Sequence, residues 1–301
     1  MTEALEQLLT EQVDDRYAAI DTASVAELAL LMNEADSSVP AAVRLAFPQI
    51  VPAIEAVTER LAAGGRLLYI GAGSAGRMGV LDAAECPPTF STPPGLVQAV
   101  IAGGGDALQI AVEGAEDDGA AGRAVVAARG VDASDAVVGI AASGRTPYVL
   151  AAVRAARERG ALTVGLSCNR NTPLSAEALY PIEVLVGPEV VAGSTRLKAG
   201  TAQKLVLNMM STIAMVRLGK TYGNLMVDLR VTNAKLRDRA LRIVERVTGA
   251  SRRDAEMALE LSGLDVKIAI VMLGASSSVD EATVRLARHG GRLREALEAS
   301  A

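Results

Sequence analysis

The chain has few of the residues that nucleic-acid-binding proteins use. Its 301 residues include no tryptophan, two phenylalanines and five tyrosines, so few aromatic rings are available for stacking on bases. It has no run of lysine or arginine, and its formal net charge is −5, so it lacks the basic patch that attracts a phosphate backbone. The composition therefore argues against nucleic acid as a partner.

Metal ligands and disulfide partners are also scarce. The single histidine, His289, and the two cysteines, Cys86 and Cys168, cannot supply the usual ligand set of a zinc site. Two cysteines in so long a chain give no disulfide framework. We therefore expect no metal, and we expect both cysteines to be reduced and partly buried.

Membrane-spanning and export signals are missing from the sequence pattern. The apolar run of residues 205–216, between Lys204 and Arg217, is too short to cross a bilayer. The acidic N-terminal stretch with Glu3, Glu6 and Glu11 lacks the basic flank and apolar core of a signal peptide. The sequence therefore predicts a cytoplasmic protein with no membrane partner.

Half of the residues are apolar, which is enough to bury a full core, and the length favours one large domain with a smaller one. Residues 1–65 have helical patterns. A capping box, Ser24-Val-Ala-Glu27, opens one helix, and a second is expected from about Pro40 to Leu61, bent by Pro48 and Pro52. We expect this region to cover a sheet edge or a partner subunit.

From residue 66 to residue 187 the pattern alternates between short apolar, partly β-branched runs and segments with helical spacing. Continuous apolar strands with helices between them predict an α/β fold with a parallel sheet covered on both faces. Ligands of such sheets bind beyond the carboxyl ends of the strands. The expected strands are Leu67 to Ile70, Leu96 to Ala102, Ala136 to Ala141, Leu162 to Ser167 and Ile182 to Val186.

A glycine-rich turn follows the first expected strand. Gly71, Gly73 and Gly76 lie between that strand and a helical segment, where free backbone N–H groups face an anion at the positive end of a helix. These glycines also match the G-x-G-x-x-G pattern of dinucleotide-binding folds. That alternative is weak, because prolines interrupt the following crossover and the next strand, which ends near Ala102, leads into three glycines with no acidic residue at its tip.

A second polar loop, Ala141-Ala-Ser-Gly-Arg-Thr-Pro147, follows the third expected strand. Thr146 can serve as N-cap with Pro147 at the first helical position, which gathers Ser143, Thr146 and backbone N–H groups around one anion. The pattern predicts a phosphate site that needs no metal. An ordinary capped helix start is the alternative.

Two glutamates are candidates for proton transfer. Glu85 precedes Cys86-Pro87-Pro88, and we expect the prolines to end the helix there and to leave Glu85 near the strand tips. Glu116 is expected at the end of a helical run that follows Gly105. Surface acids are the ordinary interpretation of any glutamate, but two carboxylates near a phosphate site suit proton transfer on a sugar phosphate.

Five motifs in one order resemble the N-acetylmuramic acid 6-phosphate etherases, and the likeness runs from near the N-terminus to the last helix. The motifs are Gly71-Ala-Gly-Ser-Ala-Gly-Arg77, Glu85-Cys-Pro-Pro-Thr89, Glu113-Gly-Ala-Glu-Asp117, Ala141-Ala-Ser-Gly-Arg-Thr-Pro-Tyr148, and Gly193-Ser-Thr-Arg-Leu-Lys-Ala-Gly-Thr-Ala-Gln-Lys204 with the following Leu205-Val-Leu-Asn208.

The resemblance implies a sugar isomerase (SIS) domain with a flavodoxin-like parallel sheet between helices, and a homodimer without a cofactor. It implies an SIS domain over residues 1–235 and a small three-helix C-terminal module over residues 236–301. It also implies cleavage of the D-lactyl ether of N-acetylmuramic acid 6-phosphate by water, giving N-acetylglucosamine 6-phosphate and D-lactate in cell-wall amino-sugar recycling.

By the same resemblance, Glu116 is the base that removes the C2 proton of the ring-opened sugar. Glu85 is the acid that protonates the departing lactate. Lys198 and Arg145 bind the lactyl carboxylate or the 6-phosphate, and the sequence leaves open which group each one binds. The full set of candidate substrate-binding residues is Gly73, Ser74, Ser143, Gly144, Arg145, Thr146, Ser194 and Lys198.

Two positions depart from the family pattern. Related etherases commonly have Thr-Ser where this chain has Ser74-Ala75, and many have Asn where it has Asp14. The competing hypothesis is a non-catalytic sensor of sugar phosphates, because the glucokinase regulatory protein resembles the etherases. That protein is longer and has two SIS domains, whereas this chain has room for one.

Overall fold

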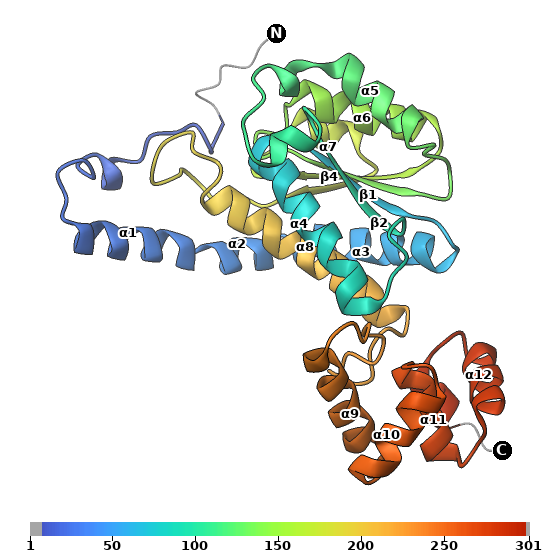
Figure 1. The fold of residues 1–301 in the computed structure, drawn as a ribbon. Coiled ribbons are helices and arrows are strands. Elements are labelled where there is room, and N and C mark those ends of the chain that lie inside the picture. Colours follow the sequence, from blue (N-terminus) through green and yellow to red (C-terminus); the bar gives the residue numbers. More distant parts are fainter. Residues whose placement is uncertain (1–7, 299–301) are drawn as a thin grey trace. The chain divides into compact units, whose positions relative to one another are not determined.

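The computed structural model describes residues 8–298 (Figure 1). Glu3 and Glu6, which belong to the acidic N-terminal stretch, lie outside these residues. The chain forms two compact units: one holds the chain up to Ala84 together with Gly95–Ser211, and the other holds Glu85–Pro94 together with the chain from Thr212 onward. The domain limits expected from the sequence, 1–235 and 236–301, stay a prediction.

A five-stranded parallel sheet in the order β2-β1-β3-β4-β5 forms the centre of the first unit. Its central strands are buried along their whole length, as continuous apolar runs require. After β1 the chain forms β2 on one side of β1 and then crosses over to form β3 on the other side. The topological switch point therefore lies between β1 and β3. The predicted α/β class is confirmed. The strands are β1 (Leu67–Gly71), β2 (Val97–Ile101), β3 (Ala136–Ile140), β4 (Leu162–Ser167) and β5 (Tyr180–Glu183).

The last strand begins and ends earlier than its apolar run suggests. We expected Ile182 to Val186, but the ladder between β4 and β5 ends at the pair Ser167 and Glu183. Strand β4 ends at Ser167, so residues after Glu183 find no strand to pair with. The Val184 amide donates one more hydrogen bond, to the Ser167 carbonyl, and the chain then leaves the sheet. Val184 and Val186 are buried without belonging to a strand.

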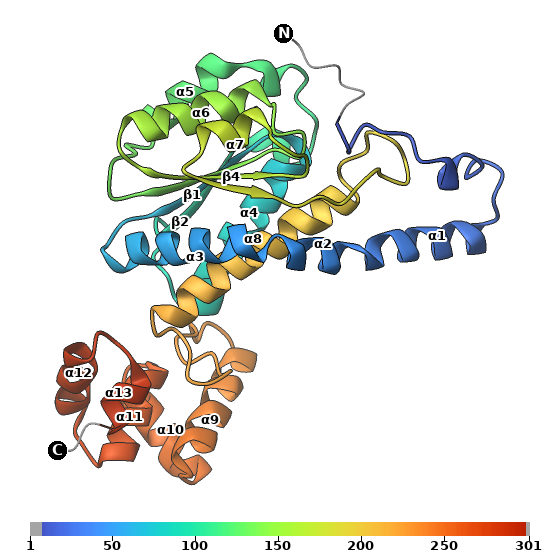
Figure 2. The ribbon, with the colours of Figure 1, turned by 180° about the vertical axis from the view of Figure 1, so that it is seen from behind.

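Helices cover both faces of the sheet in the first unit. Side chains of α6 pack on Leu68, Ile70 and Val137 from one face, and α3, α4 and α8 lie on the other, as Figure 2 shows for α3 and α8. The helices that lie in this unit or begin in it are α1 (Val25–Ser37), α2 (Val39–Leu45), α3 (Phe47–Ala62), α4 (Gly73–Phe90), α5 (Gly119–Ala128), α6 (Pro147–Glu158), α7 (Pro173–Glu177) and α8 (Lys198–Arg217).

The N-terminal helices follow the predicted caps but not the predicted continuity. The Ser24 capping box is present at the start of α1. The single helix expected from Pro40 to Leu61 is two helices, because the chain breaks at Ala46 and Pro48 lies in the first turn of α3. No single described helix is long and apolar enough to cross a membrane; the segments Val25–Leu45 and Phe47–Ala62 meet that test only as a pair bent by 65°.

Helix α4 also differs from the prediction. We expected Pro87 and Pro88 to end it, but it continues to Phe90 with both prolines inside. Proline removes a backbone donor but keeps φ near the helical value, so two adjacent prolines in the last turns cost hydrogen bonds without forcing the chain out of the helix.

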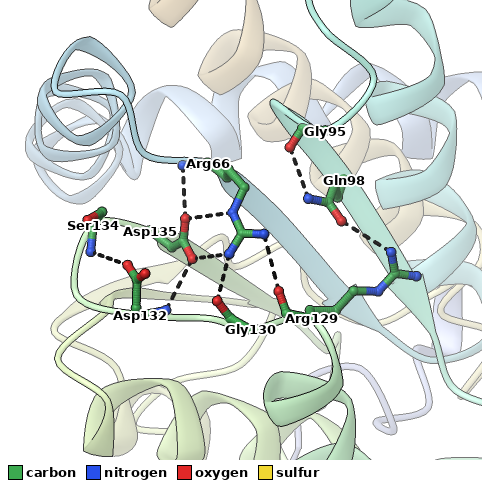
Figure 3. Close-up of polar contacts among 8 residues, drawn as sticks. All are labelled: Arg66, Gly95, Gln98, Arg129, Gly130, Asp132, Ser134 and Asp135. Atoms are coloured by element: carbon green, nitrogen blue, oxygen red, sulfur yellow. Dashed lines mark hydrogen bonds and ion pairs between the residues drawn. The ribbon is translucent and has the colours of Figure 1, made fainter.

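An ion pair between Arg66 and Asp135 joins the amino ends of β1 and β3, opposite the edge at which ligands of such sheets bind (Figure 3). The Arg66 guanidinium donates to both Asp135 oxygens, over 2.9 Å from Nε and 2.6 Å from Nη2, and also to the carbonyls of Arg129 and Gly130. Asp135 is buried. Burial alone would raise the pKa of this carboxyl, but the hydrogen bonds from Arg66 and from the Asp132 amide outweigh burial and hold the pKa below its usual range.

The second unit is helical, with its own apolar core. Where the resemblance implies a three-helix module, the described residues from 234 onward form five short helices, because left-handed residues at Gly249, Gly263 and Ser276 and the pair Gly290-Gly291 each stop a helix. The side chains of Ser251 and Ser278 cap α10 and α12 by accepting from the amides of Asp254 and Glu281. These helices are α9 (Ala234–Thr248), α10 (Arg252–Leu261), α11 (Val266–Ala275), α12 (Val279–Arg288) and α13 (Leu293–Glu298).

Candidate functional site

The glycines of the first loop allow strand β1 and helix α4 to meet closely. A Cβ atom on Gly71 would lie 2.7 Å from the Gly76 nitrogen, and a Cβ atom on Gly76 would lie 2.7 Å from Cγ1 of Ile101 in β2. Gly73 has a φ of +51°, in the left-handed region that glycine adopts without strain. The glycine pattern is therefore explained by packing and turn geometry at the carboxyl end of β1, with no dinucleotide required.

A hollow of about 230 Å³ opens at this loop. Its walls come from the start of α4, from the end of β2 and from the segment that connects β2 to α5. It contains one arginine and two glutamates among small apolar residues. The lining residues are Ala72, Gly73, Arg77, Ala102, Ala107, Ala111, Val112, Glu113, Gly114, Ala115 and Glu116.

Glu116 reaches the hollow from a one-turn 3₁₀ helix, η4 (Ala115–Asp117), and not from the longer helical run that we expected. Gly114 precedes this turn with a φ of +73°, and Asp118 follows it as the N-cap of α5, accepting a hydrogen bond of 2.8 Å from the Ala121 amide. The turn packs against α6. A left-handed glycine on one side and a helix cap on the other therefore fix the position of Glu116, whose side chain is exposed.

The second loop lies at the same edge of the sheet, after β3. Thr146 is the N-cap residue of α6 and Pro147 opens the helix, as predicted, but the Thr146 side chain accepts no capping hydrogen bond. The Ser143 hydroxyl accepts a bond of 3.2 Å from the Arg145 amide. Gly144 has a φ of +66°, and a Cβ atom there would lie 2.4 Å from Cβ of Thr172, so this loop requires glycine at that position.

The two polar loops are neighbours in the first unit. Ala72 of the first loop and Ala115 of η4 pack against the same apolar cluster as Ala141 and Tyr148, which flank the second loop. The loops that carry Gly73, Glu116, Ser143 and Thr146 therefore surround one apolar cluster at the carboxyl edge of the sheet, where ligands of such sheets bind.

Glu85 lies in α4 with an exposed side chain. It follows Gly73 by twelve residues, and at 1.5 Å per residue about 18 Å of helix separates them. The expectation that the prolines end the helix just after Glu85 is wrong, because α4 continues through them to Phe90. The acid role of Glu85 stays a prediction.

Lys198 lies in a different hollow, of about 210 Å³, which Arg16, Glu34 and Val186 also line. Its side chain is buried, and Nζ donates to the Val186 carbonyl over 2.8 Å. Burial lowers the pKa of this amine. Ser194 is half-buried in the loop before α8. The predicted substrate contacts of Ser194 and Lys198 stay predictions.

The start of α8 is held by a buried carboxylate that the sequence did not single out. Glu189 accepts hydrogen bonds of 2.9 Å from the amides of both Lys198 and Ala199, which are the first residues of the helix. Burial raises the pKa of Glu189, and these two bonds offset part of that rise. The Glu189 carboxylate therefore already occupies the positive, N-terminal end of helix α8.

Near full-length relatives identify the family. An N-acetylmuramic acid 6-phosphate etherase of Rubrobacter xylanophilus is 58% identical over 297 residues, covering 99% of this chain and 98% of its own. Relatives with the same name from Streptomyces coelicolor and Pectobacterium atrosepticum are 56% and 53% identical, covering 98% and 96% of this chain and 95% and 96% of their own. The chain belongs to the N-acetylmuramic acid 6-phosphate etherase family.

Three family models match parts of this etherase-family chain. Residues 49–157 match the N-terminal SIS domain of glucokinase regulatory protein, and residues 121–213 match the SIS domain. Residues 223–265, in the second unit, match the C-terminal lid domain of glucokinase regulatory protein. The predicted SIS fold is confirmed.

The two departures from the etherase pattern have clear local settings. Ala75 is buried in the first turns of α4, where a small side chain fits. Asp14 is paired with Arg16 over 2.6 Å, and its hydrogen bonds with that residue lower the pKa of Asp14 to about 2. The carboxylate at position 14 therefore holds in place an arginine of the Lys198 hollow.

Two charged residues of the etherase motifs lie in the hollow although no role was predicted for them. Arg77, the last residue of the first motif, lines the hollow beside Glu116, and so does Glu113. Asp82 is buried farther along α4. The position of Arg77, a cation in the first turns of a helix that follows a glycine loop, could have marked it as a ligand-binding candidate. Nothing in the sequence marks Asp82.

Within residues 8–298, no group of three or more His, Cys, Asp or Glu side chains could hold a metal ion.

Proposed function

We propose that this protein cleaves the D-lactyl ether of N-acetylmuramic acid 6-phosphate with water, giving N-acetylglucosamine 6-phosphate and D-lactate. The observation that carries the proposal is identity of more than half the residues, over nearly the whole chain, to proteins named for this activity. The position of Glu116 in a hollow at the carboxyl ends of β1 and β2 supports it, because ligands of parallel sheets bind beyond the carboxyl ends of the strands.

In the proposed reaction, Glu116 takes the proton from C2 of the ring-opened sugar, where the neighbouring aldehyde makes it acidic. The electron pair forms the C2–C3 double bond, and the C3–O bond to lactate breaks. Glu85 gives a proton to the departing lactate oxygen. Water then adds at C3 and a proton returns to C2, so substrate and one water become the two products. Ser143 and Thr146 hold the 6-phosphate at the start of α6.

We further propose that the working form is a homodimer in which Glu85 of one copy serves the hollow of the other. About 18 Å of helix between Gly73 and Glu85 supports this, because a sugar bound at the first loop is remote from the Glu85 in the same helix. Helix α8 also leaves Ile213 and Val216 41% and 45% exposed, and apolar side chains of this kind suit a contact with a second copy. The cytoplasmic location stays a prediction.

The decisive experiment measures D-lactate released from N-acetylmuramic acid 6-phosphate by the purified protein. An etherase releases one D-lactate for each N-acetylglucosamine 6-phosphate formed. A sensor like the glucokinase regulatory protein, two of whose domain models match this chain, would bind the sugar phosphate and release none.

A further inference from the structure

Arg77 is the cation of the Glu116 hollow. It lies in the first turns of α4, and its Nε–H donates to the Leu108 carbonyl over 3.2 Å. Leu108 ends the 3₁₀ turn η3 (Gly105–Leu108), which packs on β2, so the guanidinium is anchored at one edge to a fixed part of the fold. The N–H groups on its two Nη atoms are left for another acceptor, since within residues 8–298 no carboxylate pairs with Arg77.

Among the described residues of the hollow, Arg77 is the group that can meet a negatively charged ligand. Among the described residues that line the hollow, Arg77 is the single cation, while Glu113 and Glu116 are acids. Neither glutamate forms an ion pair with Arg77 among residues 8–298, so neither occupies the donors of its two Nη atoms. A planar guanidinium with two adjacent donors matches a carboxylate in a two-point contact, which a point charge does not reproduce.

We infer that Arg77 binds the lactyl carboxylate of the substrate and so selects muramic acid phosphates from other sugar phosphates; this rests on the proposed function. If Glu116 removes the C2 proton, the hollow that contains Glu116 must hold C2 and the neighbouring C3 ether. The lactyl carboxylate is nearer to C2 along the covalent chain than the 6-phosphate is. The anion that enters the hollow with C2 is therefore the carboxylate, and the phosphate is left for the second loop.

If Arg77 binds the lactyl carboxylate, its loss should weaken binding of one sugar phosphate and not of another. N-Acetylglucosamine 6-phosphate has the same sugar and phosphate but no lactyl group, so its binding does not use Arg77. A residue that held the phosphate, or that only shaped the loop through Leu108, would affect both sugars equally.

The test compares Arg77→Gln and Arg77→Lys with the unmutated protein, using Arg123→Gln as a matched control. Arg123 is a surface arginine of α5 that pairs with Glu158, outside the hollow. For Arg77→Gln we expect KM for N-acetylmuramic acid 6-phosphate to rise about 10–100-fold, the loss typical of a hydrogen-bonded ion contact. We expect the Kd for N-acetylglucosamine 6-phosphate, from calorimetry, to change less than about twofold. Arg77→Lys keeps the positive charge but loses the two-point hydrogen bonding of the guanidinium. Its KM for N-acetylmuramic acid 6-phosphate should therefore fall between those of the unmutated protein and Arg77→Gln.

An equal weakening for both sugars, or an unchanged KM, would overturn the assignment. Melting temperatures equal to that of Arg123→Gln establish that the variants are folded. If the unmutated protein released no D-lactate, the proposed function would fail, but the same calorimetric comparison of the two sugars would still test Arg77. Tighter binding of the muramic acid phosphate that disappears in Arg77→Gln would then support the contact, and equal binding of the two sugars would reject it.

Discussion

The Tyr69 hydroxyl in strand β1 donates a hydrogen bond of 2.9 Å to the buried Asp82 carboxylate in helix α4. The other oxygen of Asp82 accepts from Asn208 over 2.6 Å and from Ser211 over 3.0 Å, both in α8. One carboxylate thus links strand β1 and helices α4 and α8. The same helix carries Arg77 at the hollow, so the network fixes a helix on which the proposed site depends.

Replacing Asp82 should therefore destabilise the fold strongly. Asp82→Ala leaves three donors without this acceptor, and at about 1–3 kcal/mol for each buried group the loss should be about 3 kcal/mol or more. Tyr69→Phe removes one donor and keeps the carboxylate, so it should cost only about 1 kcal/mol. Urea unfolding midpoints measure both. Equal losses for the two variants would show that the carboxylate is not the centre of the network.

Asp82 and Asp135 should give stability opposite dependences on pH. Burial raises the pKa of Asp82, and the bonds from Asn208, Tyr69 and Ser211 offset only part of it. The folded protein then holds this proton to higher pH than the unfolded chain does, so stability falls as pH rises above 3.8, the ordinary value, through the folded pKa. The pKa of Asp135 is lowered, so its contribution is present above 3.8 and is lost as pH falls through the folded pKa.

The measurement is the free energy of unfolding against pH for the unmutated protein, Asp82→Asn and Asp135→Asn. Relative to Asp82→Asn, the unmutated protein should lose stability as pH rises above 3.8 through the folded pKa of Asp82. Relative to Asp135→Asn, it should lose stability as pH falls below the ordinary carboxyl range. Parallel curves for all three proteins would contradict the opposed shifts.

Much of the fold could be predicted from the sequence, because its strands are short apolar runs bounded by glycine and polar turns. Strand β4 was placed without error, and β1 and β3 within one residue. Strand β5 was misplaced because burial of Val184 and Val186 does not require pairing, and pairing depends on where β4 ends. The length of α4 was missed because local rules treat Pro87 as a stop, whereas packing along the helix decides whether it continues.

The candidate site, too, was predicted from the sequence only in part. The loops at Gly71 and Ser143 were found because they follow strands of one parallel sheet, and parallel strands end at one edge. The distance of Glu85 from that edge could not be read from its motif, since it depends on the helix that carries it. The burial of Lys198, whose amine donates to the Val186 carbonyl, could not be read from its motif either.

The second loop gives a prediction about substrate capture. Changing both Ser143 and Thr146 to Ala should remove two hydrogen bonds to a charged phosphate, each worth about 1.5–3 kcal/mol, and should raise the Kd for N-acetylglucosamine 6-phosphate at least tenfold. Stability should fall by no more than about 1 kcal/mol, because Thr146 makes no capping bond and the Ser143 hydroxyl accepts one bond, from the Arg145 amide. Calorimetry against the phosphorylated and unphosphorylated sugar tests it. Binding of both sugars that is unaffected by the double change would place the phosphate elsewhere.

The proposed homodimer can be tested by mixing two inactive proteins. If Glu85 of one copy serves the hollow of the other, a mixed dimer of Glu85→Gln with Glu116→Gln contains one site with both glutamates. After unfolding and refolding together in equal amounts, the mixture should recover about a quarter of the unmutated activity, because half of the dimers are mixed and one of their two sites is intact. Light scattering should show dimers. No recovery, or a fully active monomer, would reject the shared site.

The most direct test of the account follows the hydrogen on C2 of N-acetylmuramic acid 6-phosphate in deuterated water, by proton NMR, beside D-lactate release. If Glu116 is the base and Glu85 the acid, Glu85→Gln should still exchange this hydrogen while releasing little or no lactate, and Glu116→Gln should do neither. Each change should slow lactate release by about 10²–10⁴-fold or more, the usual worth of general acid–base assistance. Exchange that persists in Glu116→Gln and disappears in Glu85→Gln would reverse the two roles. Lactate release that persists in both variants would contradict the account.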